Sequence, residues 1–137
     1  MADSPNIAAT KRFGEIVNTG DLDAFSEVVA PGCIDNDPAP GQGPGPEGFK
    51  TFFTVMRSAF PDLKVEPQTL VAEGDQVAFA YTITGTHQGD FNGLAPTGRA
   101  IEVRGMQIGR FEDGKMVERW GSSDEMGMLK QLGAAPG

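Results

Sequence analysis

The sequence contains a single cysteine, Cys33, and a single histidine, His87. One cysteine cannot form an intrachain disulfide, so the fold does not require an oxidising compartment. With one thiol and one imidazole, a metal ion would have to be held almost entirely by scattered carboxylates, which argues against a metal site. We therefore expect a domain that is held together by its hydrophobic core.

Positive charge is also scarce, because 11 Lys and Arg residues stand against 19 Asp and Glu residues, a net charge of -8. A surface of this sign repels phosphate backbones and anionic lipids, so we expect neither nucleic acid nor a membrane as a partner. No apolar run approaches the ~18 residues of a membrane span, and residues 1–11 lack the basic and apolar stretches of a signal peptide. These absences predict a cytoplasmic protein.

The length of 137 residues suits one domain, and 39% hydrophobic residues with nine Phe can form a substantial core. We treat residues 1–137 as a single domain in which the ends, 1–4 and 134–137, are flexible. Apolar side chains recur at helical spacing over 5–19, 21–29 and 47–59, and these three segments predict helices. The third segment has the clearest pattern, with Phe49, Phe52, Phe53 and Met56 at positions i, i+3, i+4 and i+7.

Two other features separate the second and third predicted helices. A brief extended piece over 33–37 is followed by a stiff loop over 38–46, where seven of nine residues are Pro or Gly. After residue 62 the period changes to two, which predicts strands over 63–73, 76–87, 99–111 and 115–123. Asp113-Gly114 is a strong hairpin signal between the last two strands. Asp124 can then cap a short final helix.

Helices followed by long antiparallel strands indicate the α+β class. Each N-terminal helix can bury only one apolar stripe, and a strongly bent antiparallel sheet wrapped around all three helices buries every stripe. Such a cone can hold a ligand-sized cavity. The predicted architecture is therefore a cone-shaped α+β domain with a short C-terminal helix.

His87 shares the phase of Phe79 and Tyr81 along the strand 76–87, so we expect all three side chains to face the interior. Histidine has the one unperturbed side-chain pKa near neutrality, which suits proton transfer. The alternative is that His87 is a structural residue at the end of the strand.

Simple alternation along the last strand places five residues on one face: Met116, Glu118, Trp120, Ser122 and Asp124. Trp120 would then form a flat apolar wall of the pocket. Asp124 would be a general acid/base at the pocket rim, or it would only cap the final helix. The sequence leaves both roles of Asp124 open.

Four segments, over residues 35–50, 59–63, 72–99 and 113–133, together resemble the SnoaL-like polyketide cyclases, or ester cyclases, of the nuclear transport factor 2-like superfamily. The most specific parts are GTHQG followed by PTG, and the spacing from Trp120 to Asp124. The resemblance implies the same cone and an intramolecular aldol ring closure of an aromatic polyketide ester, without metal or cofactor. It assigns the acid/base role to Asp124, and it implies a homodimer or higher homo-oligomer formed through the sheet.

The resemblance also implies a pocket for a small hydrophobic or aromatic molecule. Catalytic roles fall on Asp124 and His87. Substrate-binding roles fall on Asn36, Asp37, Phe53, Phe79, Tyr81 and Trp120. This chain differs from many relatives in two places, because Asn36 and Arg119 stand where those relatives often carry histidine.

Two other functions fit the same sequence. One is a non-catalytic module for small-molecule binding or dimerisation. The other is a proton transfer like that of ketosteroid isomerase, in which the base follows the first strand, here at Asp37-Pro38.

Overall fold

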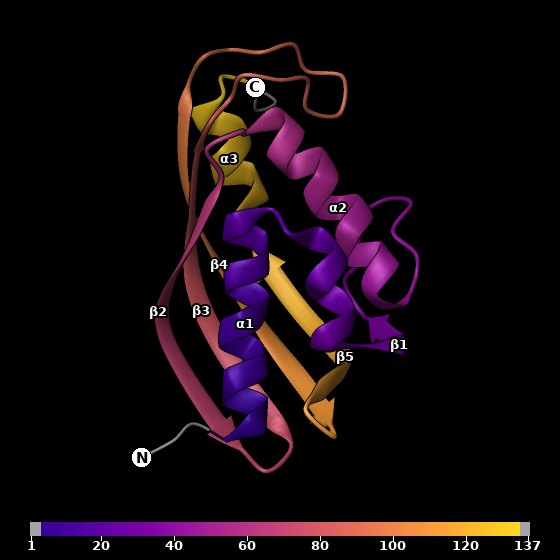
Figure 1. Ribbon diagram of the computed structural model, residues 1–137. Helices are drawn as coiled ribbons and strands as arrows, with labels where there is room; N and C mark the ends of the chain where they lie inside the picture. The colour runs from indigo at the N-terminus through magenta and orange to yellow at the C-terminus, as the bar shows by residue number, and fades with distance from the viewer. Residues whose placement is uncertain (1–3, 135–137) are drawn as a thin grey trace.

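Three helical segments lie against the concave face of a curved five-stranded sheet (Figure 1). The computed structural model describes residues 4–134, so the expected flexibility of 1–3 and 135–137 lies outside the described residues. The helices are α1 (Pro5–Thr19), the 3-10 helix η1 (Leu22–Glu27), α2 (Gly45–Ala59) and α3 (Glu125–Gln131). The strands are β1 (Val29–Asp35), β2 (Lys64–Glu73), β3 (Gln76–Thr86), β4 (Ala100–Glu112) and β5 (Lys115–Ser123).

The first helix begins and ends where its sequence predicts. The Ser4 side chain accepts a hydrogen bond from the N–H of Ile7, and Gly20 stops the helix with a left-handed φ of 81°. The second predicted helix, over 21–29, is wrong in type and in length. It is a 3-10 helix that ends at Glu27, because the β-branched Val29 already begins β1 and pairs with Met116.

The strand order is β1-β5-β4-β3-β2, and the pairs from β2 to β5 are antiparallel. Asp113 and Gly114 form the predicted two-residue hairpin turn, both with positive φ. The four strands predicted from the sequence are therefore antiparallel, and β1, which the sequence predicts only as a brief extended piece, joins the sheet by pairing with β5 in parallel. As an edge strand, β1 tolerates Pro31.

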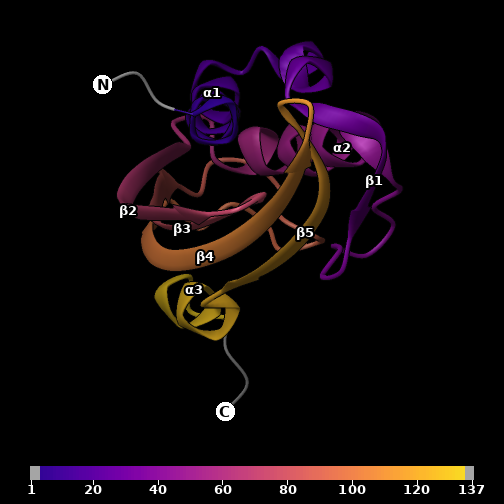
Figure 2. The same ribbon diagram turned by 90° about the horizontal axis from the view of Figure 1, so that it is seen from below.

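The sheet curves around the helices, as the view in Figure 2 shows. The centre of the core is a group of Phe rings: Phe13 lies 4.9 Å from Phe25 and 5.3 Å from Phe49, measured between ring centroids. Val77, Phe79 and Tyr81 of β3 are buried beneath the helices, as the alternation in the sequence predicts. The inward positions of β4 are the odd-numbered ones from Ile101 to Phe111.

A β-bulge in β5 reverses the faces of this strand. Phe111 pairs with Met116, but the preceding residue Arg110 pairs with Glu118, so Val117 is an extra residue. A shift of one residue exchanges the two faces of a strand. The prediction that Met116 and Trp120 share a face is therefore wrong.

After the bulge, Arg119 and Gly121 lie opposite the inward residues Gly109 and Gln107. Trp120 lies opposite Ile108, on the outer face of the sheet. The flat interior wall expected from Trp120 is therefore absent, and the inward position before it carries a guanidinium group instead.

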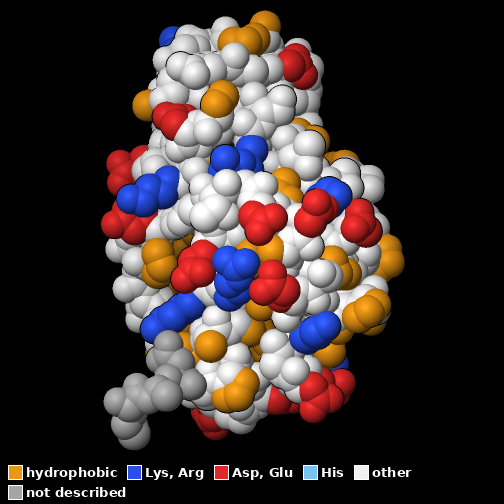
Figure 3. Space-filling view, viewed as in Figure 1, with side chains coloured by type: hydrophobic (Ala, Val, Ile, Leu, Met, Phe, Trp, Pro, Cys, Tyr) orange, Lys and Arg blue, Asp and Glu red, His pale blue; other side chains and the backbone are white. Residues whose placement is uncertain are grey.

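None of the described helices is long and apolar enough to cross a membrane. On the side of the molecule that Figure 3 shows, acidic and basic side chains are interspersed and apolar side chains are scattered among them. This side therefore carries no patch of a single charge.

Candidate active site

A nearly buried ion pair joins Asp35, the last residue of β1, to Arg119 in the middle of β5. Nη1 of Arg119 lies 3.1 Å from Oδ1 and 3.1 Å from Oδ2 of Asp35. The side chains are 15% and 6% exposed, which makes this the least exposed ion pair that residues 4–134 form. Two local features produce the contact: the bulge turns Arg119 inward, and the parallel register places Asp35 directly beside it.

The guanidinium of Arg119 is fixed by a second neighbour. Its Nε donates a hydrogen bond of 2.9 Å to Oε1 of Gln107, a buried residue of β4. Tyr81 covers this part of β4, because a Cβ on Gly105 would lie only 2.5–2.8 Å from the end of the Tyr81 ring. Burial raises the pKa of Tyr81, although the nearby Arg119 opposes the rise, so the phenol stays protonated at neutral pH. The cluster thus offers a fixed cation and a neutral hydroxyl donor.

The carboxylate of Asp35 also anchors the Pro- and Gly-rich loop after β1. It accepts a hydrogen bond of 3.0 Å from Nε2 of Gln42 and one of 2.9 Å from the backbone N–H of Asp37. Asp37 is exposed, and its own Oδ2 accepts the backbone N–H of Gly121 at 2.9 Å. The loop therefore holds Asp37 at the rim of the inward cluster. We refer to Asp35, Tyr81, Gln107 and Arg119, with Asp37 at their rim, as the arginine cluster.

Asp124 lies outside the arginine cluster. Its side chain is the N-cap of α3 and accepts the N–H of Gly127 at 2.8 Å. It is exposed, at the edge of a hollow of about 420 Å³ whose other lining residues are Arg104, Gly105, Met106, Ser122 and Ser123. The capping role left open by the sequence is observed, and the acid/base role of Asp124 stays a prediction.

The other predicted residues lie in three different places. His87 is fully buried, with its ring centroid 5.5 Å from that of Phe60. Phe53 packs in the core against Phe13 and Phe25, and Phe79 packs against Tyr81 with ring centroids 5.1 Å apart and the rings tilted by 32°. Phe79 is therefore the one predicted apolar lining residue that directly contacts the arginine cluster.

Asn36 follows β1 directly, and its exposed side chain lies toward Glu118 of β5 and not toward the ion pair of Asp35. Its Nδ2 donates hydrogen bonds of 3.0 Å to Oε2 of Glu118 and to the carbonyl of Arg119. Asn36 thereby supports the backbone that carries Arg119. The structure brings Asp37 and Tyr81 into the arginine cluster, whereas it places Asn36 and Asp124 outside.

Cys33 lies behind the ion pair on the inner side of β1. The thiol is buried, and burial together with the charge of Asp35 raises its pKa to about 11. The thiolate is the reactive form of cysteine, so this thiol is unreactive at neutral pH. Cys33 is therefore part of the packing and not a nucleophile.

Asp35 and Gln107 were not identified from the sequence, and Arg119 was noted only as a position where relatives often carry histidine, with no role assigned to it. Simple alternation places Arg119 on the outside, and the bulge at Val117 is what turns it inward. One signal for the bulge was present in the sequence. In a regular two-residue hairpin the basic Arg110 would lie opposite the apolar Val117. One extra residue in β5 places Arg110 opposite the acidic Glu118 instead. The structure contains this ion pair, with Nε of Arg110 3.3 Å from Oε1 of Glu118.

The bent sheet wrapped around α1, η1 and α2, with polar groups on its concave face, defines a nuclear transport factor 2-like cone. The family model for the SnoaL-like polyketide cyclases matches residues 7–132, so the chain belongs to that family. The resemblance seen in the sequence and the expected fold class are thereby confirmed.

Curated relatives and solved structures agree with this assignment. The chain is 29% identical to the aklanonic acid methyl ester cyclase DauD of Streptomyces sp. strain C5, over 95% of this chain and 83% of the relative. It is also 29% identical to the aklanonic acid methyl ester cyclase AcmA of Streptomyces galilaeus, over 95% and 92% of the two chains. The crystal structure of IdmH from Streptomyces antibioticus superposes with a TM-score of 0.82 at 34% identity, covering 96% and 99% of the two chains.

Proposed function

We propose that this protein is a cofactor-free, polyketide-cyclase-like enzyme that closes a ring in a neutral, hydrophobic carbonyl compound by intramolecular aldol chemistry. The observation that carries the proposal is the arginine cluster on the concave face. Arg119 is held by Asp35 and Gln107, and a protonated Tyr81 lies beside it. Family membership and the named activities of the relatives support the same class of reaction.

The proposed reaction conserves every atom of the substrate. A carboxylate removes a proton from the acidic methylene between two carbonyl groups, and the negative charge moves onto the enolate oxygen. The enolate carbon then attacks a ketone carbon of the same molecule, which forms one C–C bond and an alkoxide. The alkoxide takes up the proton from the carboxylic acid, so the product is an isomer of the substrate.

Fixed hydrogen-bond donors stabilise the developing negative charge without reorganising during the reaction. We assign this role to the guanidinium of Arg119 and the hydroxyl of Tyr81. The charge of Arg119 is already balanced by Asp35, and Asp37 adds a further negative charge at the rim. This balance favours a neutral ester or ketone over a free carboxylate.

Asp37 and Asp124 are the two candidates for the base. Asp124 is the residue that the resemblance assigns, and it caps α3. Asp37 stands at the rim of the arginine cluster, and its Oδ1 accepts no hydrogen bond from the described residues. That oxygen is therefore free to accept a proton from a substrate bound at the cluster. The geometry therefore supports Asp37, and the resemblance supports Asp124.

The activity is tested by incubating the purified protein with aromatic polyketide methyl esters, including aklanonic acid methyl ester. Because the reaction is an isomerisation, we expect a cyclised product of unchanged mass, separated by chromatography and accelerated over buffer alone. Prior treatment with a chelator is expected to leave the rate unchanged. Binding of the esters without conversion would contradict the enzyme proposal and would favour the non-catalytic binding module.

Ketosteroid-isomerase-like chemistry is a second candidate because Asp37 lies two residues after the end of the first strand and before Pro38, where that reaction would place its base. It uses the same proton abstraction and omits the C–C bond. A steroid-like 5-en-3-one distinguishes the two, since its double bond moves into conjugation and changes the ultraviolet absorbance. Conversion of this ketone with no ring closure of any ester would favour the isomerase.

We also propose that two copies associate through the outer face of the sheet. Met106 and Ile108 of β4 are 54% and 42% exposed there, and Ile108 lies opposite Trp120 on β5 and Ala78 on β3. This contiguous apolar patch is the kind of surface that a homodimer buries. Sedimentation of the wild type is expected to give twice the mass of one chain.

The substitution Ile108→Lys is expected to shift the protein to the monomer, because it places a charge at the centre of the patch. Val55→Lys is the matched control, since Val55 is 41% exposed on α2, which lies on the concave side of the sheet and away from the patch. A monomeric wild type, or equal behaviour of both variants, would contradict the proposal.

A further inference from the structure

His87 is held in one tautomer by the loop that follows it. The backbone N–H of Thr97 donates to Nδ1 of His87 at 3.1 Å, and Oγ1 of Thr97 lies 3.0 Å from the same atom. A ring nitrogen that accepts an N–H carries no proton of its own. In the neutral ring the proton is therefore on Nε2.

Nε2 of His87 is the one fully buried side-chain polar atom within residues 4–134 that has no hydrogen-bond partner. A buried donor without an acceptor costs about 1–3 kcal/mol, and nearly all such groups in folded proteins are satisfied. An acceptor from outside the described residues would therefore satisfy this N–H and remove its energetic cost.

The surroundings of this N–H are aromatic. The ring of His87 lies at 35° to Phe60, and Phe91 stands edge-on at 83° with the ring centroids 6.5 Å apart. Phe60 and Phe91 also contact each other, with ring centroids 5.6 Å apart. A flat aromatic molecule could pack among these rings, and its hydrogen-bonding atom would have to be an acceptor.

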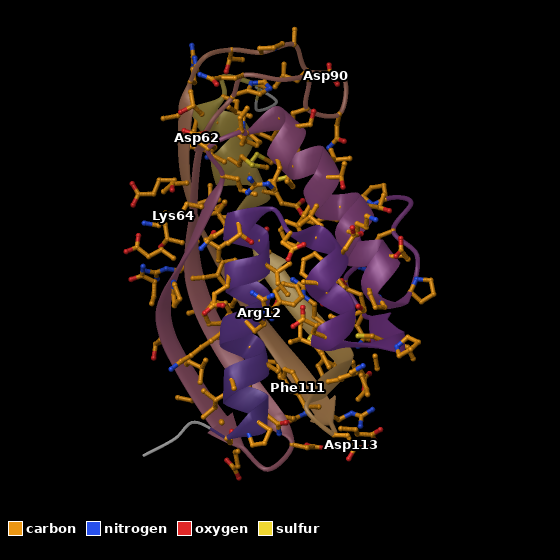
Figure 4. All side chains as sticks on the ribbon, in the orientation of Figure 1. Arg12, Asp62, Lys64, Asp90, Phe111 and Asp113 are labelled. Carbon is orange, nitrogen blue, oxygen red and sulfur yellow. The ribbon has the colours of Figure 1, made fainter. Side chains whose placement is uncertain are left out.

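Phe91 belongs to the β3–β4 loop over residues 87–99, at the end of the molecule where Figure 4 labels Asp90. Phe91 and Leu94 exchange backbone hydrogen bonds of 3.0 and 2.9 Å around a tight turn, and both side chains pack partly buried against the core. The N–H groups of Gln88 and Gly89 bond to the carbonyl of Ala59, which fixes the start of the loop on α2. Movement of the tight turn would leave this anchor intact.

We infer that His87 binds a carbonyl oxygen of an aromatic ketone or quinone ring by donating its Nε2–H, after the tight turn that carries Phe91 has moved aside. The inference rests on the proposed function, because it names a ring ketone as part of the substrate. It assigns His87 to neutral hydrogen-bond donation and not to proton abstraction, since Nδ1 is already engaged by Thr97.

The single histidine makes the test direct, because a protein labelled with ¹⁵N at histidine gives the signals of His87 alone. The probes are 9-fluorenone and fluorene, which share one carbon skeleton and differ in the carbonyl oxygen. We expect fluorenone to change the Nε2 resonance toward a hydrogen-bonded N–H while Nδ1 keeps its unprotonated shift. Fluorenone should bind about tenfold more tightly than fluorene, which corresponds to ~1.4 kcal/mol for one satisfied hydrogen bond.

The substitution His87→Phe keeps an aromatic ring and removes the donor, so it should abolish the preference for fluorenone. If this variant fails to fold, the wild-type spectra alone decide. Equal affinities of the two probes, or fluorenone binding without a change at Nε2, would overturn the inference. So would an Nε2–H that is already hydrogen-bonded to a buried water and remains so with fluorenone. These readouts need no turnover, so their failure is distinct from a failure of the ester cyclisation assay.

Discussion

Replacing Asp37 by Asn is expected to lower kcat for ester cyclisation by about 10²–10⁴-fold, the usual contribution of a general base. The amide has nearly the size of the carboxylate, and its oxygen can still accept the N–H of Gly121 that Oδ2 of Asp37 accepts at 2.9 Å. The fold and the position of the loop should therefore be retained. Steady-state kinetics with the methyl ester would measure the effect, and circular dichroism would verify the fold.

Asp124→Asn is the matched variant, because asparagine caps a helix as well as aspartate does. The hydrogen bond to the N–H of Gly127 should survive, so stability should change little. If Asp37 is the base, this variant should retain most of its activity. The reverse result, a large loss with Asp124→Asn and nearly full activity with Asp37→Asn, would assign the reaction to Asp124, as the resemblance does.

The sequence predicted the fold better than it predicted the candidate site, and β5 shows why. The order of helices and strands follows from local periods, from caps such as Ser4 and from the Asp113-Gly114 turn, and all of these act between near neighbours. Which face of the sheet Arg119 points to depends instead on one extra residue, Val117. The effect of that residue appears only when the pairing of β5 with β4 is known. A single bulge therefore exchanged the expected Trp120 for Arg119 on the concave face.

The position of β1 was equally beyond local reasoning. Its parallel pairing with β5 joins residues about 85 positions apart in the sequence, such as Asp35 and Arg119. Chain-local patterns carry no information on such a contact. By contrast, the inward orientation of His87 could be predicted correctly, because β3 pairs with β4 without a register shift and the alternation of inward and outward residues continues from Val77 to the end of the strand.

The ion pair created by this long-range pairing should control stability as well as chemistry. Asp35→Asn is expected to lower the free energy of unfolding by about 3 kcal/mol, because it leaves the guanidinium of Arg119 nearly buried without its counter-charge. The side chain of Arg119 is 15% exposed, which places the effect at the lower end of the range for buried pairs. For a chain of this size the midpoint of thermal unfolding should fall by roughly 10 °C.

Two further variants distinguish the cost of leaving a charge buried and unpaired from the cost of losing a hydrogen-bonding group. Glu27→Gln breaks the ion pair between Glu27 and Arg12, whose side chains are 58% and 35% exposed, and it should leave the free energy of unfolding nearly unchanged because water screens an exposed pair. The double variant Asp35→Leu with Arg119→Met removes both charges and should recover much of the stability lost in Asp35→Asn, since apolar pairs replace buried ion pairs at little net cost. If the double variant unfolds as early as Asp35→Asn, the loss comes from the hydrogen bonds that Asp35 makes with the loop through Gln42 and Asp37, and the carboxylate acts as a loop anchor more than as a counter-charge.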